Sequence, residues 1–370
     1  MERPATKRVL VRKVTDLETD VAEALDFLEY DFAGKKVWVK PNLLAPHPPE
    51  AGVTTDPELV RQIVRGLRAR GAAQVWVADN PAGVHRGSLA EYLAPTSIVA
   101  ASEGCFRNIS ESSLLLPVNS RFITQLPVST IITEVDVILN LPVFKTHGLT
   151  IITGAVKNIF GIIPGGHKAY LHTVAANAAE FAELLVDIYQ AVPKPLLHIM
   201  DGLRGMDGPS GPSSGRVLKI GRLLASSNGV ALDAVMTLMA NGKPAAIPTN
   251  RIANERGLGP IDPNEIAIVG DFQPVQGFRL PWPGLAAAVA RASVPVYSLL
   301  RRAPVLNRRR CIRCQECGRN CPAQAITLSP YPEINRRKCI NCYCCVEICP
   351  VRAMTVAGIP YSLWLRITGH

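Results

Sequence analysis

Two runs of four cysteines near the carboxyl end constrain this 370-residue chain more than any other feature. Each run has the spacing C-x2-C-x2-C-x3-C followed by proline; the first contains Cys311, Cys314, Cys317 and Cys321, the second Cys339, Cys342, Cys345 and Cys349. Disulfides of a small secreted domain and structural zinc are other uses of so dense a set of thiols. Zinc ribbons, however, need two C-x2-C pairs that a longer loop separates. The repeated run is instead typical of bacterial two-cluster ferredoxins and predicts two 4Fe–4S clusters.

The same pattern predicts which cysteines share a cluster. In such runs the fourth cysteine, stiffened by the proline after it, ligates the cluster of the other run. The predicted ligand sets are Cys311, Cys314, Cys317 and Cys349 for one cluster, and Cys339, Cys342, Cys345 and Cys321 for the other. Cys344 is left over and is interpreted as a bystander thiol or, alternatively, as an oxidation-sensitive one. Cys105 is expected to be an ordinary small core residue.

Positive charge is concentrated in the same segment. Residues 301–370 hold twelve Lys and Arg against three Asp and Glu, whereas residues 1–300 hold 28 against 27. Basic runs at 308–310 and 336–338 lie directly before the two cysteine runs. Two oxidised clusters together offset about four of these positive charges. The remaining positive charges are expected to tune the clusters or to bind an electron donor or acceptor protein. Nucleic acid is the less favoured partner, because no aromatic residues alternate with these basic runs.

Short β-branched runs alternate with helical patterns in the first 275 residues. Strands are expected at 8–14, 36–42, 74–81, 136–142, 197–202 and 265–271, and helices at 57–70, 174–192 and 230–239. Asp56, Pro57 and Glu58 supply an N-cap, a first-turn proline and an acidic first turn. This alternation predicts the α/β class, with a mostly parallel sheet and helices on both faces. The cysteine segment adds a small C-terminal α+β ferredoxin-like domain.

Composition divides the chain into four parts. We expect the α/β domain at 1–275, a linker with a short helix at 276–305, the two-cluster domain at 306–357 and a tail at 358–370. The chain shows no secretory signal and no run of 18 uncharged apolar residues, so a cytoplasmic location without a membrane span is expected. Peripheral membrane contact through Trp282, Leu299 and Leu300 is the alternative.

The segment 140–172 carries most of the candidate site. It combines lysines, histidines and asparagines with glycines, and no acidic residue lies between Asp136 and Glu180. Glycines let backbone amides approach a ligand and a helix N-terminus adds a positive field, so the pattern predicts an anion pocket. Ligands of such sheets bind beyond the carboxyl ends of the strands. The candidate catalytic residues are His147, Lys145 and Lys157, and the candidate substrate-binding residues are Lys40, Asn42, Asn158 and His167.

Within this site we expect the three lysines Lys40, Lys145 and Lys157 to hold an anionic group, with His147 as the proton donor. Neither a dinucleotide-binding nor a P-loop glycine motif is present.

Each of these residues also has an ordinary structural interpretation. Lys157 and Asn158 could decorate a solvated helix face, and Lys145 and His147 could belong to a loop after a strand. His167 and His172 could be surface or packing residues. A metal site made of the histidines at 147, 167 and 172 is disfavoured, because their spacing matches no dedicated zinc pattern. The glycine-rich stretch 201–221 could be a lid or substrate loop, or a flexible connection.

Four stretches resemble the family named domain of unknown function 362. They are VWVKPNL (37–43), TDPELVRQIVRGLRARGA (55–72), the 136–161 stretch with LPVFKTHGLT and GAVKNIFG, and DGLRGMDGPSGPSSG (201–215). The resemblance covers about residues 35–275, and members often carry a C-terminal two-cluster ferredoxin. It implies an iron–sulfur protein of redox metabolism and adds weight to Lys40, Asn42, Lys145, His147, Lys157 and Asn158. It implies no particular reaction.

Two hypotheses about function follow. The first is an oxidoreductase that passes electrons between its two 4Fe–4S clusters and an anionic substrate at the α/β domain. The second is a non-catalytic electron carrier or redox sensor whose α/β domain docks a protein partner. A radical-SAM enzyme is not supported, since the chain has no C-x3-C-x2-C motif.

Overall fold

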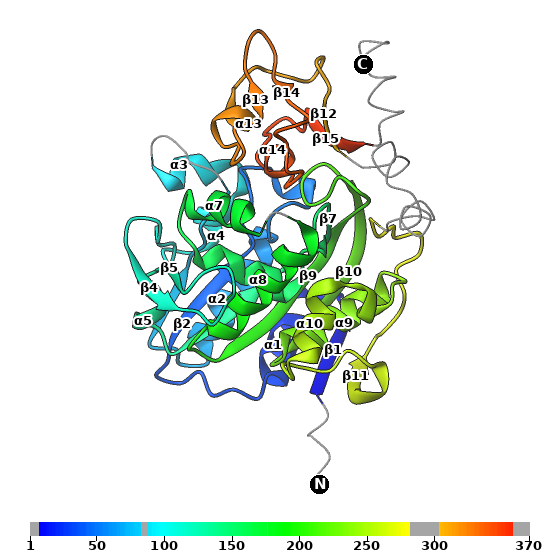
Figure 1. The fold of residues 1–370 in the computed structure, drawn as a ribbon. Coiled ribbons are helices and arrows are strands. Elements are labelled where there is room, and N and C mark those ends of the chain that lie inside the picture. Colours follow the sequence, from blue (N-terminus) through cyan, green and yellow to red (C-terminus); the bar gives the residue numbers. More distant parts are fainter. Residues whose placement is uncertain (1–6, 83–87, 176, 282–302, 358–370) are drawn as a thin grey trace.

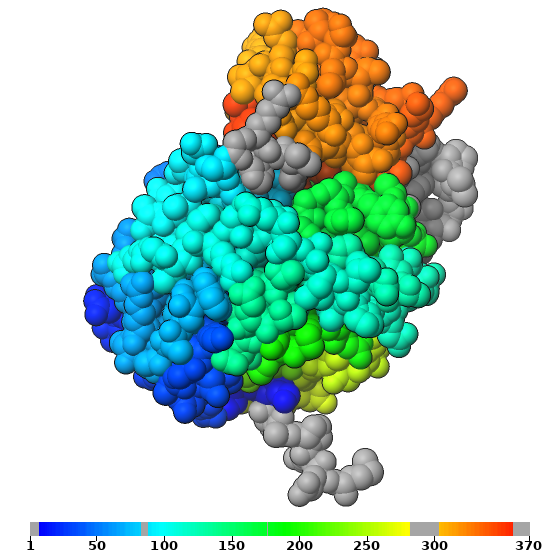
Figure 2. Space-filling view, turned by 90° about the vertical axis from the view of Figure 1, so that its left-hand side faces the viewer, coloured from blue at the N-terminus to red at the C-terminus, as the bar shows by residue number. Residues whose placement is uncertain are grey.

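The structure, a computed structural model, describes residues 7–82, 88–175, 177–281 and 303–357. An α/β lobe extends to residue 281, and a smaller cysteine lobe, residues 303–357, sits on one end of it (Figures 1 and 2). The helix expected in the linker, the residues Trp282, Leu299 and Leu300, and the tail at 358–370 lie outside the described residues. Within the described ranges, none of the helices has the length and apolar character needed to cross a membrane.

A nine-stranded sheet forms the centre of the described α/β lobe, in the order β11-β1-β10-β9-β6-β2-β3, with β7 beside β9 and β8 beside β7. Its strands are β1 (Lys7–Lys13), β2 (Lys36–Pro41), β3 (Gln74–Val77), β6 (Val137–Leu141), β7 (Val143–His147), β8 (Ile151–Ile152), β9 (Leu196–Asp207), β10 (Arg216–Ser226) and β11 (Ile266–Gly270). All six expected strands are present, although β3 ends four residues before the predicted end at 81.

The sheet is mostly parallel, as predicted. Parallel pairs join β2 to β3 and β6, β9 to β6 and β7, and β1 to β11. β10 is the main exception, since it lies antiparallel between β1 and β9. Because β2 is parallel to both β3 and β6, the carboxyl ends of these strands lie at the same end of the sheet, and residues just after β2 and β3 lie beside the cysteine lobe.

Helices pack on both faces of this sheet because neighbouring strand residues point to opposite sides. Val37 and Val39 share a core with α1 (Leu17–Phe27) and α2 (Pro57–Ala69). Trp38, between them, packs on the other face with α8 (Ala178–Ala191). The same face carries α6 (Gly154–Asn158), α9 (Gly229–Met239) and α10 (Pro248–Glu255). The remaining helices and strands of this lobe are α3 (Leu89–Leu93), α4 (Ile98–Ala101), β4 (Ser113–Pro117), β5 (Gln125–Ser129), α5 (Ile131–Glu134) and α7 (His167–Val174).

Side-chain caps set where the main helices begin. The carboxylate of Asp56 accepts a hydrogen bond from the backbone N–H of Glu58 at the start of α2, a contact worth about 1 kcal/mol. The single helix expected at 174–192 is wrong at its start. Asn177 accepts hydrogen bonds from Ala179 N and Glu180 N, so α8 begins only after it, and Val174 ends the separate helix α7.

The glycine-rich stretch 201–221 is mostly strand, which corrects the expectation of a lid or a flexible connection. β9 continues to Asp207 and β10 starts at Arg216, so only residues 208–215 form a loop. That loop packs on the cysteine lobe: the hydroxyls of Ser210, Ser213 and Ser214 donate to Val356 O at 3.3 Å, Val346 O at 2.7 Å and Met354 O at 3.2 Å.

The cysteine lobe has the small α+β form that the sequence predicts. β12 (Ala303–Leu306) pairs with β15 (Met354–Ala357), and β13 (Ile326–Thr327) with β14 (Glu333–Ile334). Two short helices, α13 (Glu316–Arg319) and α14 (Cys344–Glu347), lie inside the two cysteine runs. Asn307 and Asn335 each accept two backbone hydrogen bonds from the basic residues after them, so the turn before each run is built alike.

Candidate functional site

Eight cysteines surround two separate cavities in the cysteine lobe. Cys311, Cys314, Cys317 and Cys349 line one cavity of about 320 Å³, and Cys321, Cys339, Cys342 and Cys345 line another of about 320 Å³. Each cavity therefore brings three cysteines of one run together with the last cysteine of the other. The other walls are largely apolar, with Val351 and Met354 at the first cavity and Ile326 and Ile334 at the second. Four thiols around a mainly apolar cavity fit a 4Fe–4S cubane.

Cys105 is buried in the core of the α/β lobe, as expected. The histidine-metal alternative gains no support: among the described residues, no three His, Cys, Asp or Glu side chains gather closely enough for one metal ion.

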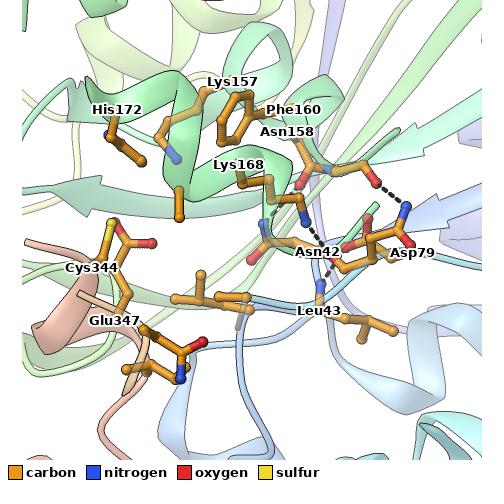
Figure 3. Close-up of a pocket in the computed structure, with 18 of the residues that line it drawn as sticks. Asn42, Leu43, Asp79, Lys157, Asn158, Phe160, Lys168, His172, Cys344 and Glu347 are labelled. Atoms are coloured by element: carbon orange, nitrogen blue, oxygen red, sulfur yellow. Dashed lines mark hydrogen bonds between the residues drawn. The ribbon is translucent and has the colours of Figure 1, made fainter. Parts of the chain in front are cut away.

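A further pocket, which we call the interlobe pocket, lies between the two lobes. Its empty space, including its open mouth, is about 810 Å³. Asn42 and Asp79 line it from the ends of β2 and β3, and residues 153–172 of α6 and α7 form a second wall. The third wall is α14 of the cysteine lobe, which contributes Cys344 and Glu347 (Figure 3). The pocket thus occupies the end of the sheet where parallel α/β proteins bind ligands.

A chain of asparagines orients the floor of the interlobe pocket. The Asn42 amide donates to Asn158 Oδ1 at 2.7 Å, and the Asn158 amide donates to Asn140 Oδ1 at 2.7 Å. Nδ2 of Asn140 in turn donates to Ala155 O at 3.1 Å and lies 3.0 Å from Nδ1 of His198. Asn42 and Asn158 both line the pocket, and these hydrogen bonds fix the orientation of their amide groups.

Lys145 lies beneath this floor rather than in the pocket. Its side chain is fully buried, and Nζ donates to Asn42 Oδ1 at 2.6 Å and to the carbonyl oxygen of Val53. Burial, helped by the charge of Lys157, lowers the pKa of Lys145 to about 7. Lys145 therefore positions Asn42, which corrects the expectation that its ammonium group holds the anion directly.

His147 is also enclosed and joins the two lobes. It is fully buried at the end of β7, and Nε2 lies 2.9 Å from Oε1 of Glu347 on α14. Nδ1 accepts hydrogen bonds from Leu149 N at 3.1 Å and Thr150 N at 3.3 Å, so the single ring proton is on Nε2. Burial lowers the pKa of His147 to about 4, which keeps the ring neutral. His147 does not line the interlobe pocket, so the expectation that it donates a proton directly to a bound substrate has no support in this geometry.

Lys40 is neutralised by a partner that the sequence analysis did not pair with it. Its buried Nζ lies 2.8 Å from Oδ1 of Asp79, whose Oδ2 accepts a hydrogen bond from Leu43 N at 2.8 Å. Burial lowers the pKa of Lys40, while Asp79 opposes that shift. Gly161 is required beside this pair, because a Cβ at that position would lie 2.1 Å from Asp79 Oδ1 and 2.4 Å from Lys40 Nζ.

The pocket-lining cations are Lys157 and Lys168. In the described parts of the chain Nζ of Lys157 has no hydrogen-bond acceptor and lies 5.7 Å from the ring centroid of Phe160. Lys168 Nζ donates to the carbonyl oxygens of Asn80 and Pro81. Burial lowers the pKa of both lysines, that of Lys168 to about 8. At neutral pH Lys168 is largely charged beside the pocket.

His172 lines the same wall, whereas His167 does not. The His172 ring stacks on Phe181 with centroids 4.2 Å apart, and burial lowers its pKa to about 3. His167 is exposed at the first position of α7 and lies outside the interlobe pocket. The expectation that His167 binds the substrate therefore has no support in this geometry. His172, from the same helix, lines the pocket instead.

Comparison with known families agrees with this architecture. A model described as "Domain of unknown function (DUF362)" matches residues 37–237, which is more than half of the chain. The chain belongs to this family. A second model, a 4Fe–4S dicluster domain, matches residues 310–353. This DUF362 protein thus combines the family domain with a segment that binds 4Fe–4S clusters.

The similar proteins do not identify a reaction for this chain. The thylakoid-associated protein sll1697 of Synechocystis sp. is 33% identical over 236 residues, which cover 61% of this chain and 70% of that protein. Among solved structures, the lactate racemase apoprotein of Thermoanaerobacterium thermosaccharolyticum gives a TM-score of 0.39 at 16% identity, and a Thermotoga maritima protein gives 0.36 at 14%. The aligned parts cover 62% and 58% of the DUF362 protein, and 57% and 55% of those chains. Similarity at this level carries no argument about function.

Proposed function

We propose that this DUF362 protein carries two 4Fe–4S clusters and passes electrons between a partner protein and a small anionic substrate bound in the interlobe pocket. One observation supports this more than any other. Helix α14, which lies between the cluster cysteines Cys342 and Cys349, also forms a wall of the pocket through Cys344 and Glu347. A ligand in the pocket would therefore contact the same helix that carries Cys345, one of the cysteines that line the second cavity.

The residues that would hold the clusters are the two groups that line the cysteine cavities. Cys311, Cys314, Cys317 and Cys349 would hold one cluster and Cys321, Cys339, Cys342 and Cys345 the other. When bound, each cluster supplies a site that takes up or releases one electron. The nine Lys and Arg residues of the cysteine lobe, against three Glu, favour the reduced and more negative form.

The α/β lobe would bind and orient the anion. Lys157 and Lys168 supply positive charge at the pocket wall, and the amides of Asn42 and Asn158 supply fixed dipoles. Lys145 and the Lys40–Asp79 pair act from beneath by holding these groups in place. Enclosure between the lobes removes water, which strengthens each of these interactions.

The proposal is tested by anaerobic reoxidation. The dithionite-reduced protein is mixed with candidate carboxylates, phosphates and oxyanions, and cluster absorbance is followed. A substrate anion should reoxidise the clusters of the wild-type protein, and Lys157→Met should slow this by about tenfold or more, because it removes a pocket cation. Lys194→Met, the same change at a half-buried lysine of the α/β lobe that does not line the pocket, should leave the rate unchanged. Equal rates for both variants would contradict a role of the pocket.

The carrier or sensor hypothesis is the alternative outcome of the same experiment. It is favoured if every anion leaves the clusters reduced while a protein electron acceptor reoxidises them, and if Lys157→Met does not alter that reaction. The basic surface of the cysteine lobe would then be sufficient for function.

A further inference from the structure

The interlobe pocket is not a simple anion site, because one wall carries a carboxylate. Glu347 lines the pocket from α14 and is 7% exposed. Figure 3 shows Glu347 on the side of the pocket formed by α14, and Lys157 and Lys168 on the side formed by α6 and α7. Oε1 of Glu347 lies 2.9 Å from Nε2 of His147, the ring nitrogen that carries the proton, so this contact between the lobes holds the carboxylate on the pocket wall. Residues 137–179 contain no Asp or Glu, but the cysteine lobe contributes the acidic residue Glu347 to the pocket.

The charges of the pocket can be counted. Lys40 and Asp79 form a pair and cancel. Lys157 and Lys168 remain, against the single carboxylate of Glu347. A ligand that carries only anionic groups would satisfy the lysines and be repelled by Glu347. A ligand that also carries an ammonium group would place opposite charges on both walls.

Buried polar atoms on the pocket walls also await partners. Oγ1 of Thr153, Oδ1 of Asn80 and Nδ1 of His172 belong to pocket-lining residues that are at most 5% exposed, and within the described residues these atoms make no hydrogen bond. Buried polar groups are nearly always hydrogen-bonded in folded proteins. Asn80 Oδ1 can only accept a hydrogen bond, whereas Thr153 Oγ1 and His172 Nδ1 can donate or accept one, so the residues of these walls retain unused hydrogen-bonding capacity.

We propose that the interlobe pocket binds a small amino acid-like molecule, with its anionic group or groups toward Lys157 and Lys168 and its ammonium group toward Glu347. This inference rests on the proposed function for the place of the ligand, and it specifies the class of ligand. The ammonium group makes a charge-assisted hydrogen bond to the carboxylate of Glu347. Binding itself involves no electron transfer.

Two matched pairs of probes test the class of ligand: L-glutamate against glutarate, and L-alanine against propionate. Each pair differs only in the amino group. Binding to the oxidised, cluster-loaded protein is measured by calorimetry and by the shift of the unfolding temperature. We expect at least one amino compound to bind about tenfold more tightly than its partner, the difference of one charge-assisted hydrogen bond.

Two variants distinguish the contributions of the two pocket walls to binding. Glu347→Gln keeps the size of the side chain and should reduce the preference for the amino compound to about threefold or less, because the charged partner is gone. Lys157→Met should weaken the binding of both compounds of a pair to the same extent. Cluster absorbance and unfolding temperature are recorded for each variant, and Lys194→Met is the matched control outside the pocket.

The possible results are distinct. Equal binding of both members of each pair, no binding of any probe, or an unchanged preference in Glu347→Gln would overturn the proposed ligand class. Because these measurements use the oxidised protein, they do not depend on turnover. Selective binding of an amino compound that fails to reoxidise the reduced clusters would retain this inference and count against the proposed function.

Discussion

Nε2 of His147, at the end of β7, lies 2.9 Å from Oε1 of Glu347, on α14 of the cysteine lobe. Both side chains are buried, so this contact between the lobes is shielded from solvent. Glu347 lies two residues from each of the cluster cysteines Cys345 and Cys349 and also lines the interlobe pocket. The contact therefore links the end of β7 to the helix that carries Cys345.

His147→Leu should lower the free energy of unfolding by about 1–3 kcal/mol, because the buried carboxylate of Glu347 loses its nearest partner. The measurement is the unfolding temperature of the oxidised protein. His147→Leu combined with Glu347→Leu should recover part of the loss, since removing both partners leaves no unpaired buried charge. A single variant as stable as the wild type would show that the contact contributes nothing.

The residues that were predictable from sequence are those with a local signal. The strand runs, the Asp56 cap and the cysteine spacing depend on neighbours in the chain, and the structure contains all of them. The strands β7 and β10 were not predicted from the sequence. β7 is short and follows β6 after one residue, and β10 continues from a glycine-rich stretch that looks like a loop.

The parts of the site that could not be predicted come from contacts distant in sequence. Asp79 lies two residues beyond the end of β3, and only the sheet brings it to Lys40. Glu347 lies inside a cysteine run, where its sequence gives no sign of a pocket residue, and only docking of the lobes brings it there. His167 and His172 have the same local pattern, and helix α7 turns only His172 inward.

The pairing of the cysteines can be tested by iron counts. Cys349→Ser and Cys321→Ser should each remove about four of about eight irons, since each breaks one ligand set. The double variant Cys349→Ser/Cys311→Ser should lose no more iron than Cys349→Ser, because both residues line the same cavity. Cys349→Ser/Cys339→Ser should lose both clusters.

Cys344→Ala is the control for these cysteine variants, because Cys344 lines the interlobe pocket and neither cysteine cavity. It should retain about eight irons. Loss of both clusters in Cys349→Ser/Cys311→Ser, but of one in Cys349→Ser/Cys339→Ser, would show the opposite pairing.

Acid should destabilise the protein through its buried histidines, and His198 is the clearest case. It is fully buried beside Asn140, and burial lowers its pKa from 6.5 to about 3. Between these two values the unfolded chain binds a proton that the folded protein excludes, so stability falls as the pH falls below 6.5, by up to about 1.4 kcal/mol per pH unit.

His198→Gln should remove this part of the pH dependence. The free energy of unfolding is measured from pH 7.5 down to about 5. It should fall less steeply in the variant, and the two slopes should differ by up to about 1.4 kcal/mol per pH unit, the value for one proton. Every other titrating group is shared, so the difference between the two curves isolates His198. Parallel curves would mean that His198 is as easily protonated in the folded protein as in the unfolded chain.

An acidic electron donor should dock on the surface beside the first cysteine cavity. Arg308 and Arg313 lie 5.5 Å and 5.8 Å from the ring centroid of Tyr331, and Ile312 between them in sequence is 61% exposed. Ile312 also lines the cavity of Cys311, so this surface is close to one cluster site. An exposed apolar residue next in sequence to one of two arginines that share a tyrosine ring is suited to a partner with an acidic rim.

Arg308→Glu/Arg313→Glu should slow reduction by an acidic one-electron donor, such as reduced plant-type ferredoxin, by about tenfold at low ionic strength. Stopped-flow absorbance gives the rate constant, and the difference from wild type should shrink near 0.5 M salt, where the Debye length is only about 4 Å. Lys243→Glu/Arg251→Glu makes the same change of net charge at exposed residues of the α/β lobe and should react like the wild type. Equal slowing by both double variants would show that overall charge, and not this surface, governs the encounter.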